Sequence, residues 1–263
     1  MPRPHHLLLP LLLLLLLNVS LADIQDIVAA CTEFRTCGCA LGVTKGKPAL
    51  ARVRNKETDK GCIGVLINDL YILANAECRN MTNRTDVELT VTLKKERVAV
   101  DSVILPPDHF PDMIPRQNNI MLLRLRAPLN MSLHVPICLP EASLFVHLGA
   151  KALIMSPGHL RIGVKIQGRK CCYRRRTMGL VRSILLREGL FLCAGEVTTP
   201  FCNHEPGNLL VMKRHGWFTL LGLSTTQEFF TMCGNSMGLF SEVLPLREWI
   251  RNNTQDASQC QFV

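Results

Sequence analysis

The chain has 263 residues, of which 48% are hydrophobic and 12 are cysteines, and its formal net charge is +9. This length is sufficient for one large or two modest hydrophobic cores. The positive charge comes with only two tryptophans, two tyrosines and no recognition motif, so we expect no nucleic-acid partner.

Residues 1–22 have the pattern of a signal peptide. Arg3 precedes an unbroken leucine-rich run, and the segment ends in NVSLA, where Ser20 and Ala22 suit the positions required before a cleavage site. The apolar run is too short to span a bilayer as a helix. The chain ends in NNTQDASQCQFV, without the hydrophobic tail of a lipid-anchor signal. We therefore expect a secreted, extracellular protein without a transmembrane anchor.

Residues 23–48 form a cysteine-rich segment ahead of the main domain. Cysteines of an exported chain usually form disulfides that staple its loops. Zinc is the competing interpretation, but the close pairs Cys37/Cys39 and Cys171/Cys172 lack the spacing of zinc-finger ligands. The histidines after the leader show no paired spacing either: His109, His134, His147, His159, His204 and His215. We expect disulfides, no metal and no cofactor.

Four Asn-X-Ser/Thr motifs follow in the predicted mature chain. They begin at Asn80, Asn83, Asn130 and Asn252. Each motif is weak alone, but export makes it usable as an N-glycosylation site, and we expect all four in exposed turns.

A series of short apolar segments separated by turn-forming residues indicates β-strands. The segments are 63–67, 71–75, 87–93, 98–105 and 120–125 in the first half, and 152–155, 163–166, 190–193, 208–212, 217–223 and 238–243 in the second. The halves join near Pro140, which favours two packed barrels or sandwiches within residues 49–255. Apolar residues at helical spacing in 244–253 predict a short C-terminal helix, followed by a tail at 256–263.

Four blocks of sequence carry a more specific signal. They are CIGVLINDLYILANAEC at 62–78, NNIMLLRL with PICLP at 118–140, FLCAG with CNHEPGNLLV at 191–211, and MCGNSMGLFSEVLPLREWI at 232–250. In this order they resemble the trypsin- and chymotrypsin-like serine proteases. The resemblance implies an all-β fold of two packed antiparallel six-stranded barrels with a short C-terminal helix.

The resemblance also locates the positions where this family carries its catalytic residues. Glu77 stands at the histidine position, Asn119 at the aspartate position and Pro206 at the serine position. A carboxylate is a weak base for a serine hydroxyl, and proline supplies neither a hydroxyl nor a backbone N–H for an oxyanion hole. His204 replaces an oxyanion-hole glycine, and Pro200 stands where trypsins keep a specificity aspartate. We expect no proteolytic activity.

The activation sequence of the family is missing as well. Its zymogens are cut after a basic residue ahead of an IVGG-like start, whereas here Asp26 precedes Ile27-Val28 and no glycine pair follows. Glu205 keeps an acid at the internal position that would receive the new amine. A buried charge without its partner is unfavourable, so we interpret Glu205 as solvated or locally paired.

The family template also implies disulfide pairings. Cys62–Cys78 and Cys202–Cys233 match family bridges, Cys193 is expected to pair with Cys171 or Cys172, and Cys138 with one of Cys31, Cys37 or Cys39. Another family bridge is lost at both ends, at Met212 and within AKAL at 150–153. The cysteines left over, including Cys260, pair among themselves or with another chain.

Positive charge concentrates after residue 168. Arg169, Lys170, Arg174, Arg175 and Arg176 could form a patch for sulfated glycans, anionic membranes or an acidic protein. A solvated surface loop is the simpler interpretation, since charge runs are usually just exposed.

These observations favour an inactive, secreted and glycosylated serine-protease homologue that acts by binding. Its partner would be an unidentified extracellular protein, an acidic one among the options, or a sulfated glycan. The alternatives are a weak serine-type endopeptidase with a relocated nucleophile and a basic glycan- or polyanion-binding protein.

Overall fold

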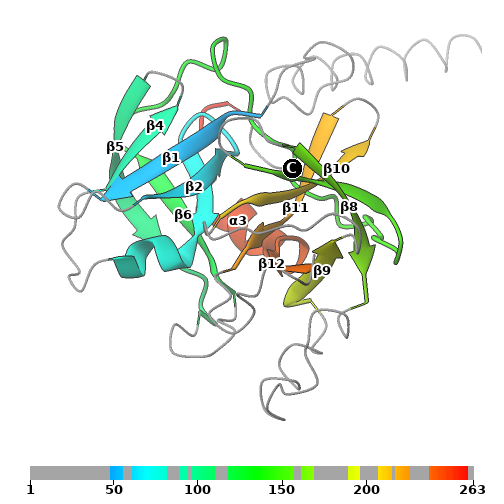
Figure 1. Cartoon of the computed structure of the whole chain (residues 1–263). Helices are drawn as coiled ribbons and strands as arrows, with labels where there is room; N and C mark the ends of the chain where they lie inside the picture. Colours follow the sequence, from blue (N-terminus) through cyan, green and yellow to red (C-terminus); the bar gives the residue numbers. More distant parts are fainter. Residues whose placement is uncertain are drawn as a thin grey trace, which may run out of the picture.

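Two closed antiparallel β-barrels of six strands each, followed by a short helix, make up the protein (Figure 1). The computed structural model describes residues 48–55, 61–81, 89–93, 96–109, 118–156, 161–168, 189–195, 207–214, 217–225 and 237–259. This architecture confirms the expected all-β fold with two six-stranded barrels.

Barrel 1 has the strand order β1-β2-β3-β6-β5-β4. Its strands are β1 (Leu50–Asn55), β2 (Gly61–Leu66), β3 (Tyr71–Asn75), β4 (Leu89–Leu93), β5 (Glu96–Ile104) and β6 (Ile120–Leu125). The strand patterns above begin at residue 63 and therefore missed β1, which closes the barrel between β2 and β4. In β1, buried Ala51 and Val53 alternate with exposed Arg52 and half-buried Arg54, so the arginines interrupt the apolar residues along the strand.

Barrel 2 has the strand order β10-β11-β12-β9-β8-β7. Its strands are β7 (Lys151–Met155), β8 (Arg161–Gln167), β9 (Phe191–Gly195), β10 (Leu209–Arg214), β11 (Trp217–Ser224) and β12 (Met237–Glu242). The side chains of Ile154, Val164 and Phe240 point into its own core. A second, larger hydrophobic core fills barrel 1 and extends to the outer face of barrel 2, where Met155 and Leu209 are part of it. We call it the shared core.

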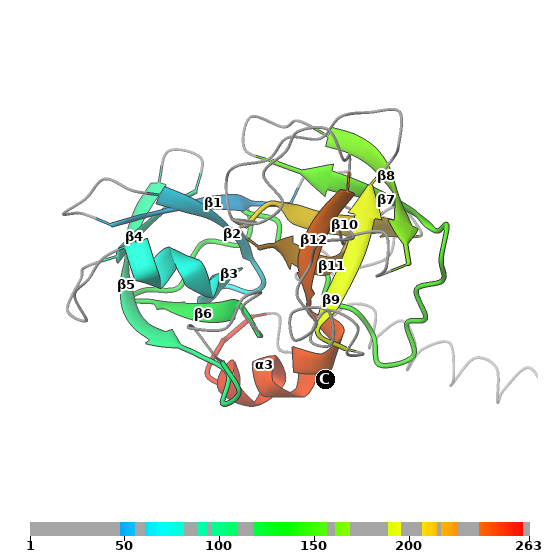
Figure 2. The ribbon, with the colours of Figure 1, turned by 60° about the horizontal axis from the view of Figure 1, so that its bottom comes forward.

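Residues 126–150 connect the barrels, as expected near Pro140, and touch barrel 2 on the way. Cys138 forms a parallel bridge with Thr219 of β11, and its carbonyl accepts a 2.8 Å hydrogen bond from the Leu220 N–H. Figure 2 shows the barrels side by side with the C-terminal helix beneath them. The contact between the barrels is thus partly apolar packing and partly backbone hydrogen bonding.

The expected C-terminal helix is present but divided. A 3-10 turn, η5 (Leu244–Leu246), precedes the α-helix α3 (Arg247–Asn253). Leu246 and Ile250 are buried against the shared core, as their helical spacing predicted. Pro245 lies within the 3-10 turn, and proline is accommodated in the first turn of a helix but not in its interior.

After α3 the chain returns to barrel 1 and is fixed there. Asp256 accepts hydrogen bonds from Tyr71 Oη at 2.7 Å and from Arg124 Nε at 2.8 Å, while buried Asp69 accepts from Ser258. Burial, together with Asp256, raises the pKa of Tyr71 to about 12. Burial alone would raise the pKa of Asp256, but the hydrogen bonds from Tyr71 and Arg124 outweigh it and hold this pKa below 3.8.

Within the described residues, no helix combines the length and the apolar character needed to cross a bilayer.

Candidate functional site

The pairing of β3 with β6 brings Glu77 and Asn119 together. Asn75 at the end of β3 is opposite Ile120 at the start of β6. Glu77 follows Asn75 by two residues on the 3-10 helix η2 (Ala76–Met81), and Asn119 immediately precedes β6. Asn118 adopts a left-handed φ of 46°, a conformation that asparagine tolerates better than most residues. The backbone therefore delivers the two family positions to one point.

The side chains of Glu77 and Asn119 are hydrogen-bonded to each other and buried. Asn119 Nδ2 donates to Glu77 Oε1 at 2.6 Å, and Asn119 Oδ1 accepts from the Glu77 backbone N–H at 3.1 Å. Thr225, just after β11 of barrel 2, donates its hydroxyl to the same Glu77 oxygen at 3.2 Å. Glu77 and Thr225 are each 5% exposed, and Asn119 is fully buried. Such a charge-assisted pair, shielded from water, is a strong interaction.

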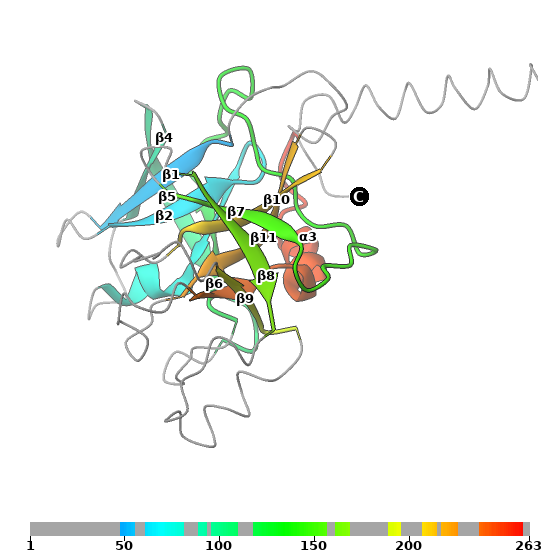
Figure 3. The same ribbon diagram turned by 45° about the vertical axis from the view of Figure 1, so that its right-hand side comes forward.

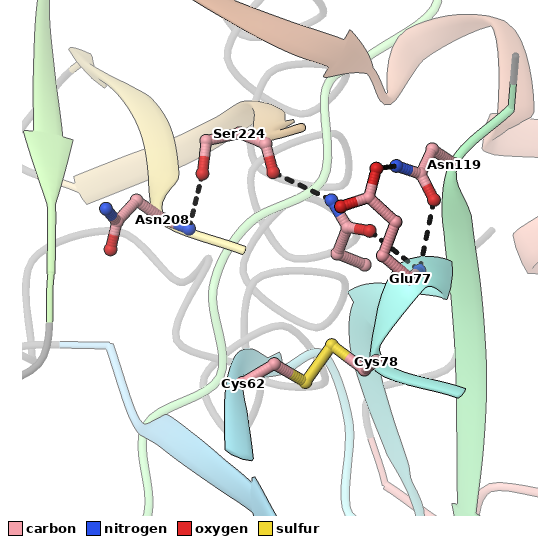
Figure 4. The surroundings of a disulfide bond; sticks show 7 residues. Cys62, Glu77, Cys78, Asn119, Asn208 and Ser224 are labelled. Atoms are coloured by element: carbon pink, nitrogen blue, oxygen red, sulfur yellow. Dashed lines mark hydrogen bonds between the residues drawn. A yellow bond between two sulfur atoms is a disulfide. The ribbon is translucent and has the colours of Figure 1, made fainter. Parts of the chain in front are cut away.

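Asn75 adds a second link between the barrels. Its Nδ2 donates to the backbone carbonyl of Ser224 in β11 at 2.7 Å, and its Oδ1 accepts from the Glu77 N–H at 2.9 Å. Figure 4 shows this row of hydrogen bonds from Ser224 across to Glu77 and Asn119. We call Asn75, Glu77, Asn119, Ser224 and Thr225 the polar seam, because they join the ends of β3, β6 and β11.

The segment leading into β10 is also held at the seam. Gly207 N–H donates to the Ser224 carbonyl at 3.0 Å, and Asn208 N–H donates to Ser224 Oγ at 2.9 Å. Gly207 has a φ of 94°, and a Cβ there would lie 2.3 Å from the Ile63 carbonyl oxygen of β2. Only glycine fits this close approach between the barrels.

A disulfide anchors η2 next to the seam. Cys62 in β2 is bonded to Cys78, with the two Cα atoms 5.8 Å apart (Figure 4). Both cysteines are almost fully buried. The pairing is the one that the family resemblance implies. Cys138 and Cys193 also take part in disulfides, but their expected partners lie outside the described residues.

Several predicted site residues lie outside the described part of the chain. These are Pro206, His204, Pro200, Glu205, Cys202, Cys233, Asn83, Arg169, Lys170, Arg174, Arg175 and Arg176. The positions expected for the nucleophile, the oxyanion hole and the basic segment therefore stay predictions.

The other three predicted glycosylation sites, Asn80, Asn130 and Asn252, lie in three different types of secondary structure. Asn130 is exposed at a turn, with its Oδ1 accepting from the Ser132 N–H at 2.9 Å, as expected for a glycosylation motif. Asn80 lies on η2, and Asn252 is exposed on α3, so neither is in the turn that we expected. The Thr254 hydroxyl of the last sequon is buried and donates to the Ile250 carbonyl.

Sequence reasoning missed Asn75 and Thr225 as members of the site. The available signal for Asn75 was an amide closing the otherwise apolar strand YILAN, all of which is buried. A buried amide needs hydrogen-bond partners, and both of its partners come from outside its own strand. Nothing local marks Thr225, because its contact with Glu77 joins residues 148 positions apart.

Chemically, the polar seam is a buried network of hydrogen-bond donors and acceptors. A base must be able to reach the proton that it removes, yet Glu77 is 5% exposed and its Oε1 already accepts hydrogen bonds from Asn119 and Thr225. Across the described residues, no cluster of three or more His, Cys, Asp or Glu side chains could hold a metal ion. The arrangement is suited to joining two barrels.

The comparisons with known proteins agree with this fold. The sequence model described as Trypsin matches residues 42–250. Phenoloxidase-activating factor 1 of Holotrichia diomphalia is 24% identical over 230 residues, covering 73% of this chain and 61% of that protein. Vitamin K-dependent protein C of Rattus norvegicus is 26% identical over 216 residues, covering 73% of this chain and 45% of that protein.

A solved structure described as "Structure of GrC" superimposes with a TM-score of 0.61 at 22% identity, covering 82% of this chain and 97% of that one. At that identity the superposition speaks for the fold alone. The chain spans less than two thirds of the length of the two curated relatives. With the family match extending over most of its length, both barrels included, the chain belongs to the trypsin family.

Proposed function

We propose that this trypsin-family chain is an inactive, secreted homologue that acts by binding another molecule. The observation that supports the proposal is the pair formed by Glu77 and Asn119. These residues occupy the family positions of the general base and its orienting acid, and they bond to each other at 2.6 Å. The catalytic machinery of the family needs an imidazole in the first position and a carboxylate in the second.

In this pair the direction of the hydrogen bond is the reverse of the one in the family's catalytic residues. In the family the orienting group accepts a hydrogen bond from the base, whereas here Asn119 donates to Glu77. The same carboxylate oxygen receives a further hydrogen bond from the Thr225 hydroxyl at 3.2 Å. A charge held in this way has a structural role between the barrels.

A relocated nucleophile is the competing hypothesis, and Thr225 is its best described candidate. Its hydroxyl lies 3.2 Å from a carboxylate oxygen, a distance suitable for proton transfer. However, Thr225 and Glu77 are each only 5% exposed. A peptide carbonyl could reach this hydroxyl only if the barrels separated at the polar seam, which disfavours the hypothesis.

Secretion and glycosylation belong to the same proposal. They are supported by the signal-peptide pattern of residues 1–22 and by the exposure of Asn130 and Asn252. The partner is an extracellular protein, an acidic one among the options, or a sulfated glycan. N-terminal sequencing of the secreted chain should begin at Asp23, and treatment with an N-glycosidase should lower its apparent mass.

The inactivity is tested with the purified secreted protein, before and after limited trypsin treatment. We expect no cleavage of peptide or ester libraries and no labelling by a fluorophosphonate probe, while an active trypsin-family enzyme is labelled in parallel. Thr225→Val serves as the control for the relocated nucleophile and should behave like the parent chain. Stoichiometric labelling of the parent at one hydroxyl, abolished by substituting that residue, would overturn the proposal.

A further inference from the structure

The carboxylate of Asp69 is buried between β2 and β3, and it is bound by the end of the chain. Asp69 is 1% exposed. Its Oδ1 accepts a hydrogen bond from the Gln259 N–H at 3.1 Å, and its Oδ2 accepts from both the N–H and the hydroxyl of Ser258. These donors lie 189 and 190 positions away in sequence. Among the described residues, every donor to this carboxylate belongs to the segment that follows α3.

A carboxylate that is removed from water needs such donors. Burying an ionised carboxyl group without hydrogen bonds is highly unfavourable, whereas charge-assisted hydrogen bonds are among the strongest in proteins. The backbone of Asp69 is fixed as well, because its carbonyl accepts from the Leu129 N–H at 2.7 Å. The buried position of the Asp69 carboxylate is therefore stable because Ser258 and Gln259 supply its donors.

Asp256 and Ala257 attach the same segment to barrel 1 at two further points. Asp256 accepts hydrogen bonds from Tyr71 Oη and Arg124 Nε, and these two residues are direct register partners in the β3–β6 ladder. Ala257 is buried in the shared core. Residues 254–259, which we call the strap, thus hold the β2–β3 connection and both strands of one ladder.

The three attachments differ in strength. The Asp256 and Arg124 side chains are 46% and 33% exposed, and ion pairs of such exposure contribute little because water screens them. The hydrogen bonds to Asp69 are shielded from water, where they are stronger and where losing them leaves a buried charge. We therefore expect the contact with Asp69 to provide most of the attachment.

The strap carries the chain from barrel 2 back to barrel 1. β12 is the last strand of barrel 2, and η5 and α3 follow it directly. Figure 3 shows α3, in red, close to the strands of barrel 2, as Figure 2 does from another side. The strap then reaches the β3–β6 ladder where Tyr71 pairs with Arg124, whereas Asn75 pairs with Ile120 at the other end. The ladder is thus held at one end by the polar seam and at the other by the strap.

We infer that the strap keeps barrel 1 in its closed form. Without the strap, the β3–β6 ladder is held only by the polar seam, and the Asp69 carboxylate loses its donors. Barrel 2 keeps its own core, which includes Ile154, Val164 and Phe240. A protease that removes the strap therefore loosens barrel 1 selectively. This inference goes beyond the proposed binding role, because it concerns how the end of the chain controls the rigidity of the first barrel.

Two truncated chains test the inference, since both lack residues 260–263 and only one keeps the strap. One ends at Gln259 and should behave like the full-length chain, and the other ends at Thr254. Native hydrogen–deuterium exchange is followed by mass spectrometry in peptides covering β3 and β6, and in peptides covering β7 and β8. In the chain ending at Thr254, exchange should be at least about tenfold faster in β3 and β6 and change less than about threefold in β7 and β8, because hydrogen bonds to a buried charge are lost from barrel 1 alone.

Asp69→Asn identifies the contact that is responsible. In the chain ending at Gln259 it should speed exchange in β3 at least about fivefold, whereas in the chain ending at Thr254 the change should be below about twofold, since the donors are already absent. A milder variant keeps the full-length chain: Ser258→Ala removes one donor and should speed exchange in β3 about threefold. Its matched control is Ser143→Ala, at an exposed serine of the connecting segment, which should leave this exchange unchanged.

Three results would each overturn the inference. They are equal exchange in the two truncated chains, equal acceleration in both barrels, and an effect of Asp69→Asn that is independent of chain length. If the chain ending at Thr254 does not fold, Ser258→Ala decides: acceleration confined to barrel 1 supports the inference, and exchange equal to that of Ser143→Ala contradicts it. None of these readouts depends on whether the chain cleaves peptides.

Discussion

Restoring the family's aspartate should damage this protein, and the polar seam explains why. In Asn119→Asp, a carboxylate oxygen replaces the amide nitrogen that now lies 2.6 Å from Glu77 Oε1. The strong hydrogen bond becomes a contact between two buried carboxyl groups. Both cannot stay ionised at that distance, so one of them must bind a proton in the folded chain.

The size of the effect follows from two independent estimates. Two unit charges about 4 Å apart repel by about 4 kcal/mol at an effective dielectric constant of about 20. Protonating one carboxyl group with an ordinary pKa of about 4 requires about 4 kcal/mol at pH 7 and about 1.4 kcal/mol at pH 5. The free energy of unfolding should therefore fall by about 4 kcal/mol at pH 7.

The sign of the pH dependence is also determined. A carboxyl group whose pKa is raised by folding destabilises the folded chain increasingly as the pH rises above its unfolded pKa. The loss relative to the parent chain should therefore be larger at pH 7 than at pH 5, by about 2.7 kcal/mol. Comparing variant with parent at each pH removes the pH dependence that the two chains share.

The assay is urea unfolding at both pH values with the disulfides intact, followed by the fluorescence of Trp217 and Trp249. Asn119→Ala is the reference, because it loses the hydrogen bond without adding a charge, and it should be destabilised by about 1.5–3 kcal/mol at either pH. The exchange Glu77→Gln with Asn119→Asp swaps donor and acceptor. It should recover stability to within about 1 kcal/mol of the parent, since the amide and carboxylate are paired again.

The reasoning would be refuted by either of two results. Asn119→Asp could lose no more stability than Asn119→Ala at pH 7, with no difference between the two pH values. Alternatively, the exchanged pair could show a coupling energy below about 0.5 kcal/mol, the level at which independent sites are additive. Each result would mean that the two side chains do not share the buried contact seen here.

Three further outcomes are expected from unfolding measurements. Because the hydrogen bonds from Tyr71 and Arg124 lower the pKa of Asp256 despite its partial burial, its contribution is complete at neutral pH and is lost as the pH falls through the lowered pKa. Asp256→Asn should lower the free energy of unfolding by about 1 kcal/mol at pH 7 and by progressively less as the acid is titrated, a small value because the side chain is 46% exposed; a loss that does not shrink in acid would contradict the lowered pKa. Gly207→Ala should lower the melting temperature by several degrees, because its Cβ would clash with the Ile63 carbonyl; an unchanged value would contradict the close approach. Replacing Cys62 and Cys78 together by serine should remove about 3 kcal/mol, as expected for a loop of 16 residues, and a loss below about 1 kcal/mol would show that the bridge constrains little.

The strand pattern of this protein is largely determined by local sequence. Segments such as YILAN and IMLLRL are nearly all apolar and become strands buried on both faces. The sequence pattern did not predict β1, because Arg52 and Arg54 interrupt its apolar residues. Its place in the barrel is determined by its hydrogen-bonded pairing with β2 and β4. These pairings depend on the tertiary structure and leave no mark in the local pattern of apolar residues.

The family positions could likewise be located from sequence, because their flanking blocks are local. Glu77 precedes Cys78, and Asn119 precedes the apolar run of β6. That these two side chains bond to each other depended on the β3–β6 register. Register is a property of paired strands, so neither segment alone contains it.

Tertiary structure alone decided what the substituted residues do. Asn75 and Thr225 reach partners 149 and 148 positions away, across the boundary between the barrels. Sequence patterns report which face of a strand is buried. The choice of partners for the polar and charged side chains comes from how the strands and barrels pack.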